Sequence, residues 1–232
     1  MRKIYYGKAV YDNKEIKAVL NVLKNKSLTL IDGENVKKLE KIVSSMFGKK
    51  YGLMVNSGSS ANLLGLSSFN FKKGSEVITP NLTFSTTVAP IYQLGLIPHF
   101  VGVEENKFLA DASHIEKCIN KKTVALMIPN LLGNIADWKK INLIAKKYKL
   151  KIIEDCAHAI ESKFNNKHVG NFGDAGCFSF YSTKNLTTGE GGMITCKDKN
   201  IYEKIRIARL HGLSKDAWKR HLPESVNKKQ YE

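Results

Sequence analysis

Lys184 differs from the other lysines of this chain in the residues that lie on either side of it. It follows an apolar run that ends at Ser179-Phe180-Tyr181, and it precedes the glycine-rich turn Gly189-Glu190-Gly191-Gly192. Most lysines are surface residues, but the segments around this one are typical of a tight pocket rather than an exposed helix. The spacing of Ser179 and Lys184 would let a hydroxyl and an amine meet the two ends of one small ligand.

Two adjacent acids, Glu154 and Asp155, end a second apolar run that begins at Lys151. In a mainly parallel sheet, ligands bind beyond the carboxyl ends of the strands. One of the two carboxylates should therefore leave the sheet at that edge, where it could pair with a cationic ring nitrogen. An acid that only caps the following loop fits the same residues, so both interpretations stay open from the residues alone.

A third segment, Asn56-Ser57-Gly58-Ser59-Ser60-Ala61, follows the apolar run 53–55 and precedes a predicted helix over 62–69. Glycine lets the backbone approach a ligand closely, serine caps helices, and free N–H groups at a helix start attract anions. The segment could therefore bind an anion. A plain helix cap explains the same residues equally well.

The elements that must position these residues alternate along the chain. Short apolar and β-branched runs predict strands. Apolar residues at helical spacing predict a first helix over 16–23 and further helices between the earlier strands. Asp137 is the predicted N-cap of a helix over 138–149. This alternation predicts an α/β fold with a mainly parallel sheet and helices on both faces. The predicted strands are 53–55, 76–79, 98–103, 124–128, 151–154, 177–181 and 192–196.

Composition narrows the class of protein. The chain has 232 residues, of which 43% are hydrophobic, which suits one large domain with a sizeable core. It contains no apolar run long enough to cross a membrane and no signal-peptide core at its start, so we expect a cytoplasmic protein without a membrane partner. The lack of a CxxC pair predicts no metal site and small buried cysteines. The cysteines are Cys118, Cys156, Cys177 and Cys196.

The net charge of +16 raises the question of nucleic-acid binding. Of the 37 cationic residues, 33 are Lys and 4 are Arg. Base readout and bidentate phosphate contacts favour Arg, and the lysines are spread along the whole chain. We therefore expect a solvated basic surface and no nucleic-acid partner.

Together, the three segments and their neighbours resemble the sugar-nucleotide aminotransferases of the DegT/StrS type, which are fold-type I enzymes dependent on pyridoxal phosphate (PLP). The resemblance runs from about residue 5 to residue 220. It implies an N-terminal arm and first helix over 1–35 and a PLP-binding large domain over 36–221. The polar tail 222–232 would mark a truncation point, with the small C-terminal domain largely missing. The matching stretches are NSGSSAN, TPNLTFSTTVAP, LLGNIADW, IIEDCAHA and SFYSTKNLTTGEGG.

The resemblance also implies a role for each candidate residue. Lys184 would form a Schiff base with PLP and shuttle the proton between the substrate carbon and the cofactor, while Asp155 would keep the pyridine nitrogen protonated. Gly58–Ser60 and Ser179 would bind the phosphate. Phe84 would stack on the ring, and His158 would lie near the ring hydroxyl. A core role for Phe84 and a satisfied buried histidine at 158 are the alternatives.

The activity that the resemblance implies is transfer of an amino group from an amino acid, expected to be glutamate, to a nucleotide-linked keto-sugar. Such reactions serve cell-surface polysaccharide or amino-sugar biosynthesis, and the resemblance implies a homodimer because active sites of the family form between subunits. One alternative is a related sugar dehydratase, a group that carries His in place of the Schiff-base lysine. Another is a non-catalytic, truncated remnant that kept the PLP-binding fold. Lys184 favours the aminotransferase.

Overall fold

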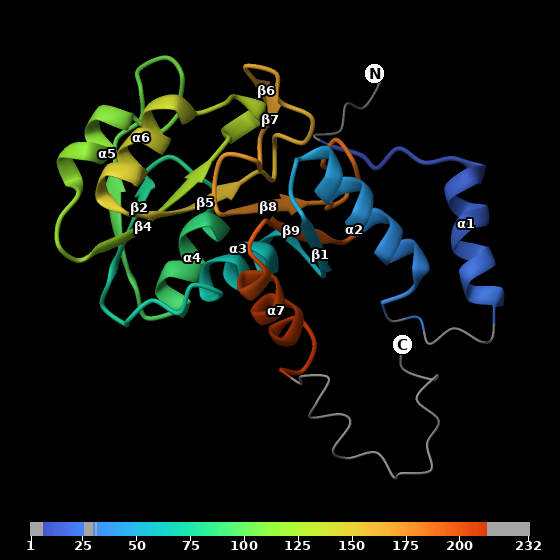
Figure 1. The fold of residues 1–232 in the computed structure, drawn as a ribbon. Helices are drawn as coiled ribbons and strands as arrows, with labels where there is room; N and C mark the ends of the chain where they lie inside the picture. The colour runs from blue at the N-terminus through green and yellow to red at the C-terminus, as the bar shows by residue number, and fades with distance from the viewer. Residues whose placement is uncertain (1–6, 26–29, 31, 213–232) are drawn as a thin grey trace, which may run out of the picture.

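Seven strands form the central sheet of the computed structural model, which describes residues 7–25, 30 and 32–212 (Figure 1). They are β1 (Tyr51–Val55), β2 (Glu76–Pro80), β3 (Ile97–Val101), β4 (Thr123–Pro129), β5 (Lys151–Asp155), β8 (Ala175–Ser179) and β9 (Gly192–Cys196). A separate two-stranded hairpin contains β6 (Lys163–Phe164) and β7 (Lys167–His168). Each of the seven predicted strands is confirmed, with bounds that differ by at most two residues at either end.

The strand order in the large sheet is β1-β9-β8-β5-β4-β2-β3. The pairs that join β3, β2, β4, β5 and β8 are all parallel. Only β9 runs against its neighbours, since it pairs antiparallel with both β8 and β1. The prediction of a mainly parallel sheet is therefore confirmed, and the exception is the strand that follows the glycine-rich turn.

Helices cover both faces of the sheet, as predicted. They are α1 (Asn13–Lys24), α2 (Glu34–Met46), α3 (Gly58–Ser67), α4 (Ser85–Gln93), α5 (Ala112–Cys118), α6 (Trp138–Tyr148) and α7 (Lys199–Ala208), with a 3-10 turn η1 (Leu131–Gly133). In Figure 1, α5 and α6 lie above the sheet, and α3, α4 and α7 lie below it. Successive side chains of β4 point to opposite faces of the sheet. Ala125 and Met127 pack in the core between the sheet and α3, while Leu126 and Ile128 pack in the core between the sheet and α6.

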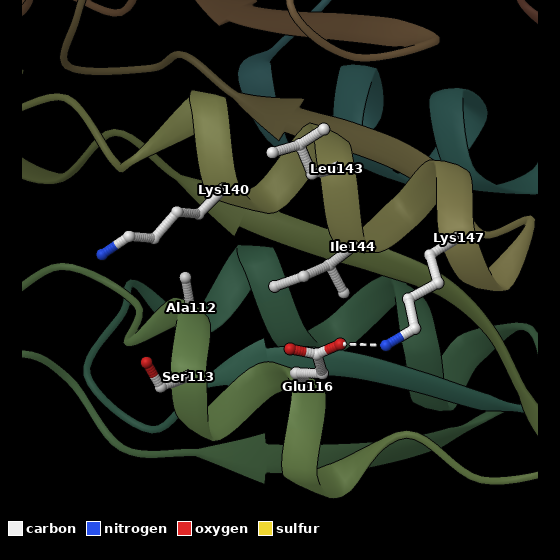
Figure 2. A pocket seen from close by; sticks show the side chains of 7 residues that line it. All are labelled: Ala112, Ser113, Glu116, Lys140, Leu143, Ile144 and Lys147. Carbon is white, nitrogen blue, oxygen red and sulfur yellow. Dashed lines mark hydrogen bonds and ion pairs between the residues drawn. The ribbon is translucent and has the colours of Figure 1, made fainter.

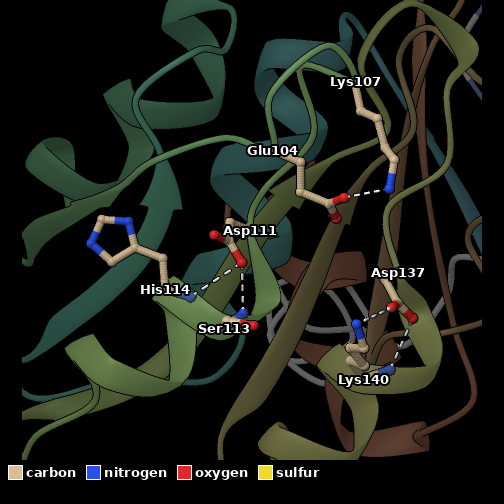
Figure 3. A network of polar contacts seen from close by, with 7 residues as sticks. All are labelled: Glu104, Lys107, Asp111, Ser113, His114, Asp137 and Lys140. Atoms are coloured by element: carbon tan, nitrogen blue, oxygen red, sulfur yellow. Dashed lines mark hydrogen bonds and ion pairs between the residues drawn. The ribbon is translucent and has the colours of Figure 1, made fainter.

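Aspartates fix the starts of the two short helices on the upper face (Figure 3). Asp111 Oδ1 accepts hydrogen bonds from the amides of Ser113 at 2.8 Å and His114 at 3.3 Å, at the start of α5. Asp137 accepts from the amide of Lys140 at 3.1 Å, at the start of α6. These bonds satisfy N–H groups that have no partner inside the helix. The predicted N-cap at Asp137 is therefore confirmed.

Helix α1 is well capped, yet none of its residues is buried. Asp12 accepts a hydrogen bond from the amide of Lys14, and Glu15 accepts one from the amide of Asp12 at 2.8 Å, which together make a capping box. The helix predicted over 16–23 is confirmed, but the described residues leave its apolar face uncovered. The exposed side chains of that face are Ile16, Val19, Leu20 and Leu23.

The buried-cysteine prediction is correct for three of the four residues. Cys156, Cys177 and Cys196 are buried, whereas Cys118 is partly exposed because it is the last residue of the short surface helix α5. In the part of the chain that the structure describes, none of the helices has the length and apolar character needed to cross a membrane. The predicted tail 222–232 lies outside the described residues.

Candidate active site

Lys184 lies in the connection from β8 to β9 and is half-buried. Its amide donates to the carbonyl of Tyr181 at 2.9 Å, and the amide of Phe180 donates to the carbonyl of Gly191 at 2.9 Å, so both ends of the connection are held. Burial lowers the pKa of Lys184, and the nearby Asp155 carboxylate opposes that shift. The neutral amine, which is the nucleophilic form, is therefore more populated than in an exposed lysine.

The Asp155 carboxylate is buried at the end of β5 and is held at both oxygens. Its Oδ2 atom accepts from Asn62 Nδ2 at 2.9 Å and from Thr87 Oγ1 at 2.7 Å. Its Oδ1 atom accepts from the amide of Ala157 at 3.1 Å. The donors belong to α3, to α4 and to the turn after β5, so three separate segments fix one carboxylate.

Glu154 has a different role, because successive side chains of a strand point to opposite faces. It is fully buried, and its carboxylate accepts from the amides of Gly170 at 2.7 Å and Gly173 at 2.5 Å. Lys49 Nζ donates to the carbonyl of Gly173 at 2.5 Å. Burial raises the pKa of Glu154, and the Gly173 amide and the charge of Lys49 oppose the rise. The loop-organising interpretation therefore fits Glu154, and Asp155 is the acid on the side of α3 and α4.

Helix α3 begins at Gly58, four residues before the predicted start at 62. Its N-cap is Ser57, whose Oγ atom accepts from the amide of Ser60 at 3.1 Å. Gly58, Ser59 and Ser60 are therefore the first turn of the helix rather than a loop before it. Within the described chain, the amides of Gly58 and Ser59 have no carbonyl partner, as expected for a first turn. These two N–H groups are available to an anion.

Ser179 lies directly against this helix start. A Cβ atom added to Gly58 would lie 2.7 Å from Ser179 Cβ and 3.1 Å from Ser179 Oγ, which is too close for an ordinary contact. Glycine at position 58 is what allows the close approach. A hydroxyl from the end of β8 thus stands beside the free amides of α3, although the two segments are far apart in the sequence.

Phe84 and His158 are both accessible to solvent. Phe84 is the N-cap residue of α4 and is 63% exposed, so the alternative that it belongs to the core is wrong. His158 is half-buried, and its Nδ1 atom accepts from the amide of Leu132 at 3.3 Å. Burial lowers the pKa of His158, and the positive charge of Lys184 lowers it further. A neutral imidazole therefore lies near Lys184, with Nε2 left as its N–H donor.

Sequence reasoning missed Asn62 and Thr87 as partners of Asp155. Both stand inside the segments NSGSSAN and TPNLTFSTTVAP, so their location in the chain was a usable signal. The missing information was direction, because only the packing of α3 and α4 on β5 turns Asn62 and Thr87 toward Asp155.

A surface hollow of about 220 Å³ lies elsewhere, between α5 and α6 (Figure 2). Its walls include Ala112, Leu143 and Ile144, and an ion pair of 2.9 Å between Lys147 Nζ and Glu116 Oε1 crosses its rim. Exposed ion pairs of this kind contribute little to stability. None of the predicted site residues lines the hollow, so the chemistry directs attention to the surroundings of Lys184.

Gly192, the first residue of β9, provides a test of the packing between β9 and the start of α3. A Cβ atom on Gly192 would collide with the carbonyl of Ser57 and would lie 2.6 Å from the amide of Gly58. We expect Gly192→Ala to lower the free energy of unfolding by about 1–3 kcal/mol, because overpacking forces the backbone to move. Denaturant unfolding measures the change. Gly33→Ala is the matched control, since nothing lies within 4 Å of a Cβ there; equal losses in both variants would contradict the expectation.

Known proteins resemble this chain in sequence and in fold. The spore coat polysaccharide biosynthesis protein SpsC of Bacillus subtilis is 37% identical over 93% of the chain and 55% of its own length. The solved structure of PseC, an aminotransferase of Helicobacter pylori involved in the biosynthesis of pseudoaminic acid, matches with a TM-score of 0.87 and 33% identity. That match covers 93% of this chain and 58% of PseC.

A third relative is the GDP-4-keto-6-deoxy-D-mannose-3-dehydratase of Escherichia coli, solved with bound hydrated PLP. It matches with a TM-score of 0.85 and 36% identity over 96% of this chain and 57% of its own. The chain thus spans little more than half the length of each of these relatives.

A family model matches residues 10–229, nearly the whole chain, and it is that of the DegT/DnrJ/EryC1/StrS aminotransferases. The chain therefore belongs to the DegT/DnrJ/EryC1/StrS aminotransferase family, whose cofactor is pyridoxal phosphate.

Proposed function

We propose that this chain is the PLP-binding part of an aminotransferase that transfers an amino group from an amino acid, expected to be glutamate, to a nucleotide-linked keto-sugar. The observation that carries the proposal is the half-buried amine of Lys184, with its lowered pKa, near the carboxylate of Asp155. The matches to SpsC and PseC support a role in the biosynthesis of polysaccharides or amino sugars.

The donor groups fit PLP in their chemistry. The cofactor carries an aldehyde, a basic ring nitrogen and a phosphate, which call for an amine, an acid and N–H or hydroxyl donors. Lys184 supplies the amine and Asp155 the acid. The free amides at the start of α3 and the Ser179 hydroxyl supply an anion site, in a space that a Cβ on Gly58 would fill. The residues present therefore match the group.

Each residue then has a place in the proposed site. Lys184 would hold the aldehyde carbon, Asp155 the ring nitrogen, and Gly58–Ser60 with Ser179 the phosphate. The exposed ring of Phe84 would cover one face of the pyridine, and His158 would donate from Nε2 to the ring hydroxyl. When bound, PLP supplies an electron-accepting ring that stabilises negative charge on the substrate carbon.

The work of the chain itself is to place charges and to move one proton. Lys184 Nζ would accept the proton from the carbon of the amino donor, a role that requires an amine that is neutral in part of the cycle. Asp155 would favour a protonated ring nitrogen through its negative charge. Burial and then the charge of Lys184 lower the pKa of His158, which favours its neutral form.

Lys184 also supports the aminotransferase over the dehydratase. Identity does not separate them, since the dehydratase is 36% identical and PseC 33%. In the resemblance described above, dehydratases carry His at the position of Lys184. A deoxygenated sugar product, in place of an aminated one, would reverse the choice.

The remaining parts of the proposal concern organisation. We propose an N-terminal arm and first helix over 1–35, a PLP-binding domain over 36–221 and a tail over 222–232. We also propose a cytoplasmic homodimer, for which the family resemblance is the support. A non-catalytic PLP-binding remnant is the competing function, and any turnover that depends on Lys184 would exclude it.

Reduction with borohydride tests the proposal directly. The protein is mixed with PLP, reduced, digested and mapped by mass spectrometry. We expect the PLP adduct on the peptide that contains Lys184, since burial lowers the pKa of its amine and Asp155 lies near it. An adduct on exposed Lys199 instead, or no adduct at all, would refute the assignment.

A further inference from the structure

The acceptor sites of the Asp155 carboxylate can be counted, and three of the four are used. A carboxylate has two oxygens with two lone pairs each. Oδ2 accepts two hydrogen bonds, from Asn62 Nδ2 at 2.9 Å and Thr87 Oγ1 at 2.7 Å. Oδ1 accepts one, from the amide of Ala157 at 3.1 Å. One acceptor site is therefore left, and it belongs to Oδ1.

The direction of the hydroxyl protons follows from the same count. The Thr87 hydroxyl has a single proton, which must point at the carboxylate because the carboxylate only accepts. Thr83 Oγ1 lies 2.8 Å from Thr87 Oγ1 and so donates to it. The result is a chain from Thr83 through Thr87 to Asp155, in which each bond strengthens the next.

The side-chain NH₂ group of Asn62 is also fully used in hydrogen bonds. Its Nδ2 atom uses both protons, one for Asp155 and one for the carbonyl of Thr86 at 3.1 Å. Asn62 and Thr87 are 2% and 1% exposed, so water does not compete for these bonds. An inverted amide would place its oxygen against two acceptors, which fixes the orientation of Asn62.

We propose that Asn62 and Thr87 are positioning residues that occupy Oδ2 of Asp155 and so leave only Oδ1 to receive the N–H of the cofactor ring. The inference rests on the proposed function, because it takes PLP as the ligand of Asp155. It assigns the two residues no contact with PLP; they act through the carboxylate.

Thr87 connects the Asp155 clamp, by which we mean Asn62 and Thr87 on Oδ2 of Asp155, to Phe84, the residue predicted to stack on the ring. The amide of Thr87 donates to the carbonyl of Phe84 at 2.9 Å in the first turn of α4. A shift of that turn would move the ring of Phe84 and the donor to Asp155 together. The first turn of α4 thus positions both Phe84 and one of the two donors that hold Asp155.

Thr87→Val tests the clamp, since it keeps the shape of the side chain and removes the hydroxyl. We expect PLP to bind about tenfold more weakly, because a lost hydrogen bond to a charged group lets the carboxylate turn away. We expect Asn62→Ala to act in the same direction. The ¹⁵N signal of the ring nitrogen in bound, labelled PLP should also shift, and a residue with a purely structural role would leave that signal in place.

Two further variants separate positioning from general damage. Thr87→Ser restores the hydroxyl and should restore both affinity and the ¹⁵N signal. Thr195→Val removes a hydroxyl from an equally buried residue of β9, whose Oγ1 bonds to the carbonyl of Gly176 at 3.4 Å, and should change neither. If Thr87→Val does not fold, Asn62→Ala decides the matter by the same two measurements.

The inference is overturned if Thr87→Val and Asn62→Ala bind PLP as the unchanged protein does, with an unmoved ¹⁵N signal. That result would leave the proposed function intact, provided that the unchanged protein carries its adduct on Lys184. If the unchanged protein carries no such adduct, the proposed function fails first and the inference fails with it.

Discussion

Replacing Lys184 with alanine should remove the PLP adduct and lower the amino-acid half-reaction at least about 1,000-fold, because the proposed function assigns both the attachment and the proton transfer to this one side chain. The half-reaction is measured as the 2-oxo acid formed from glutamate, so the sugar need not be known. The neighbouring groups give a physical reason for the size of the effect. Burial lowers the pKa of the Lys184 amine near Asp155, whereas the other buried lysine, Lys49, donates to the carbonyl of Gly173 beside Glu154.

Lys199→Ala is the matched control for that experiment. Lys199 is the exposed first residue of α7 and belongs to no contact of the site. It should retain normal activity and the adduct on Lys184. Restoration of part of the lost activity by added methylamine would show that the missing amine, rather than a disturbed fold, explains the Lys184→Ala defect. Activity that survives in Lys184→Ala would point to a different lysine as the attachment residue.

The strands could be predicted because their apolar, β-branched runs leave few other structures open to them. The direction of β9 could not be predicted in the same way. A run such as Gly192–Cys196 carries no sign of its direction; it is the folding back of the connection after Ser179 that makes β9 antiparallel to β8. The exposure of the apolar face of α1 could not be predicted either, since helical spacing predicts an apolar face without saying what packs on it.

The start of α3 was placed too late for a related reason. Glycine and serine have low helix propensity, which made Gly58–Ser60 look like a loop. The structure overrides that preference, because Ser57 caps the helix and Ala61 and Leu66 pack in the core below the sheet. Local propensity is a weak guide where tertiary packing decides.

The choice between Glu154 and Asp155 shows what the sequence alone could not predict about the candidate site. Alternation along a strand says that the two point to opposite faces, and the sequence does not say which face carries the ligand. That depends on Asn62 and Thr87, which reach Asp155 from helices that lie 93 and 68 residues away in the chain. Adjacent residues thus acquire separate tasks only through long-range contacts.

Asp155→Asn should lower the amino-acid half-reaction by about two to three orders of magnitude, since it leaves the charge on the ring nitrogen without its partner. The donors already in place make the outcome specific. Asn62 and Thr87 would hold the oxygen of the new amide at the position of Oδ2. Its NH₂ group would then occupy the position of Oδ1, lose the hydrogen bond from the Ala157 amide and face the ring with a donor.

A donor at that position favours a ring nitrogen without its proton, which accepts electrons poorly. The absorbance of bound PLP and the ¹⁵N signal of its ring should both report the deprotonated form, while the adduct on Lys184 persists. Asp155→Glu keeps the charge and should lose less activity, although its longer side chain displaces the carboxylate from the donors of α3 and α4. Equal activity in Asp155→Asn and the unchanged protein would mean that the ring nitrogen has another partner. The side chains of Asp and Asn are nearly the same size. A large loss of activity in Asp155→Asn with a normal free energy of unfolding would therefore mean that the proton on the ring nitrogen, and not a change in packing, explains the loss.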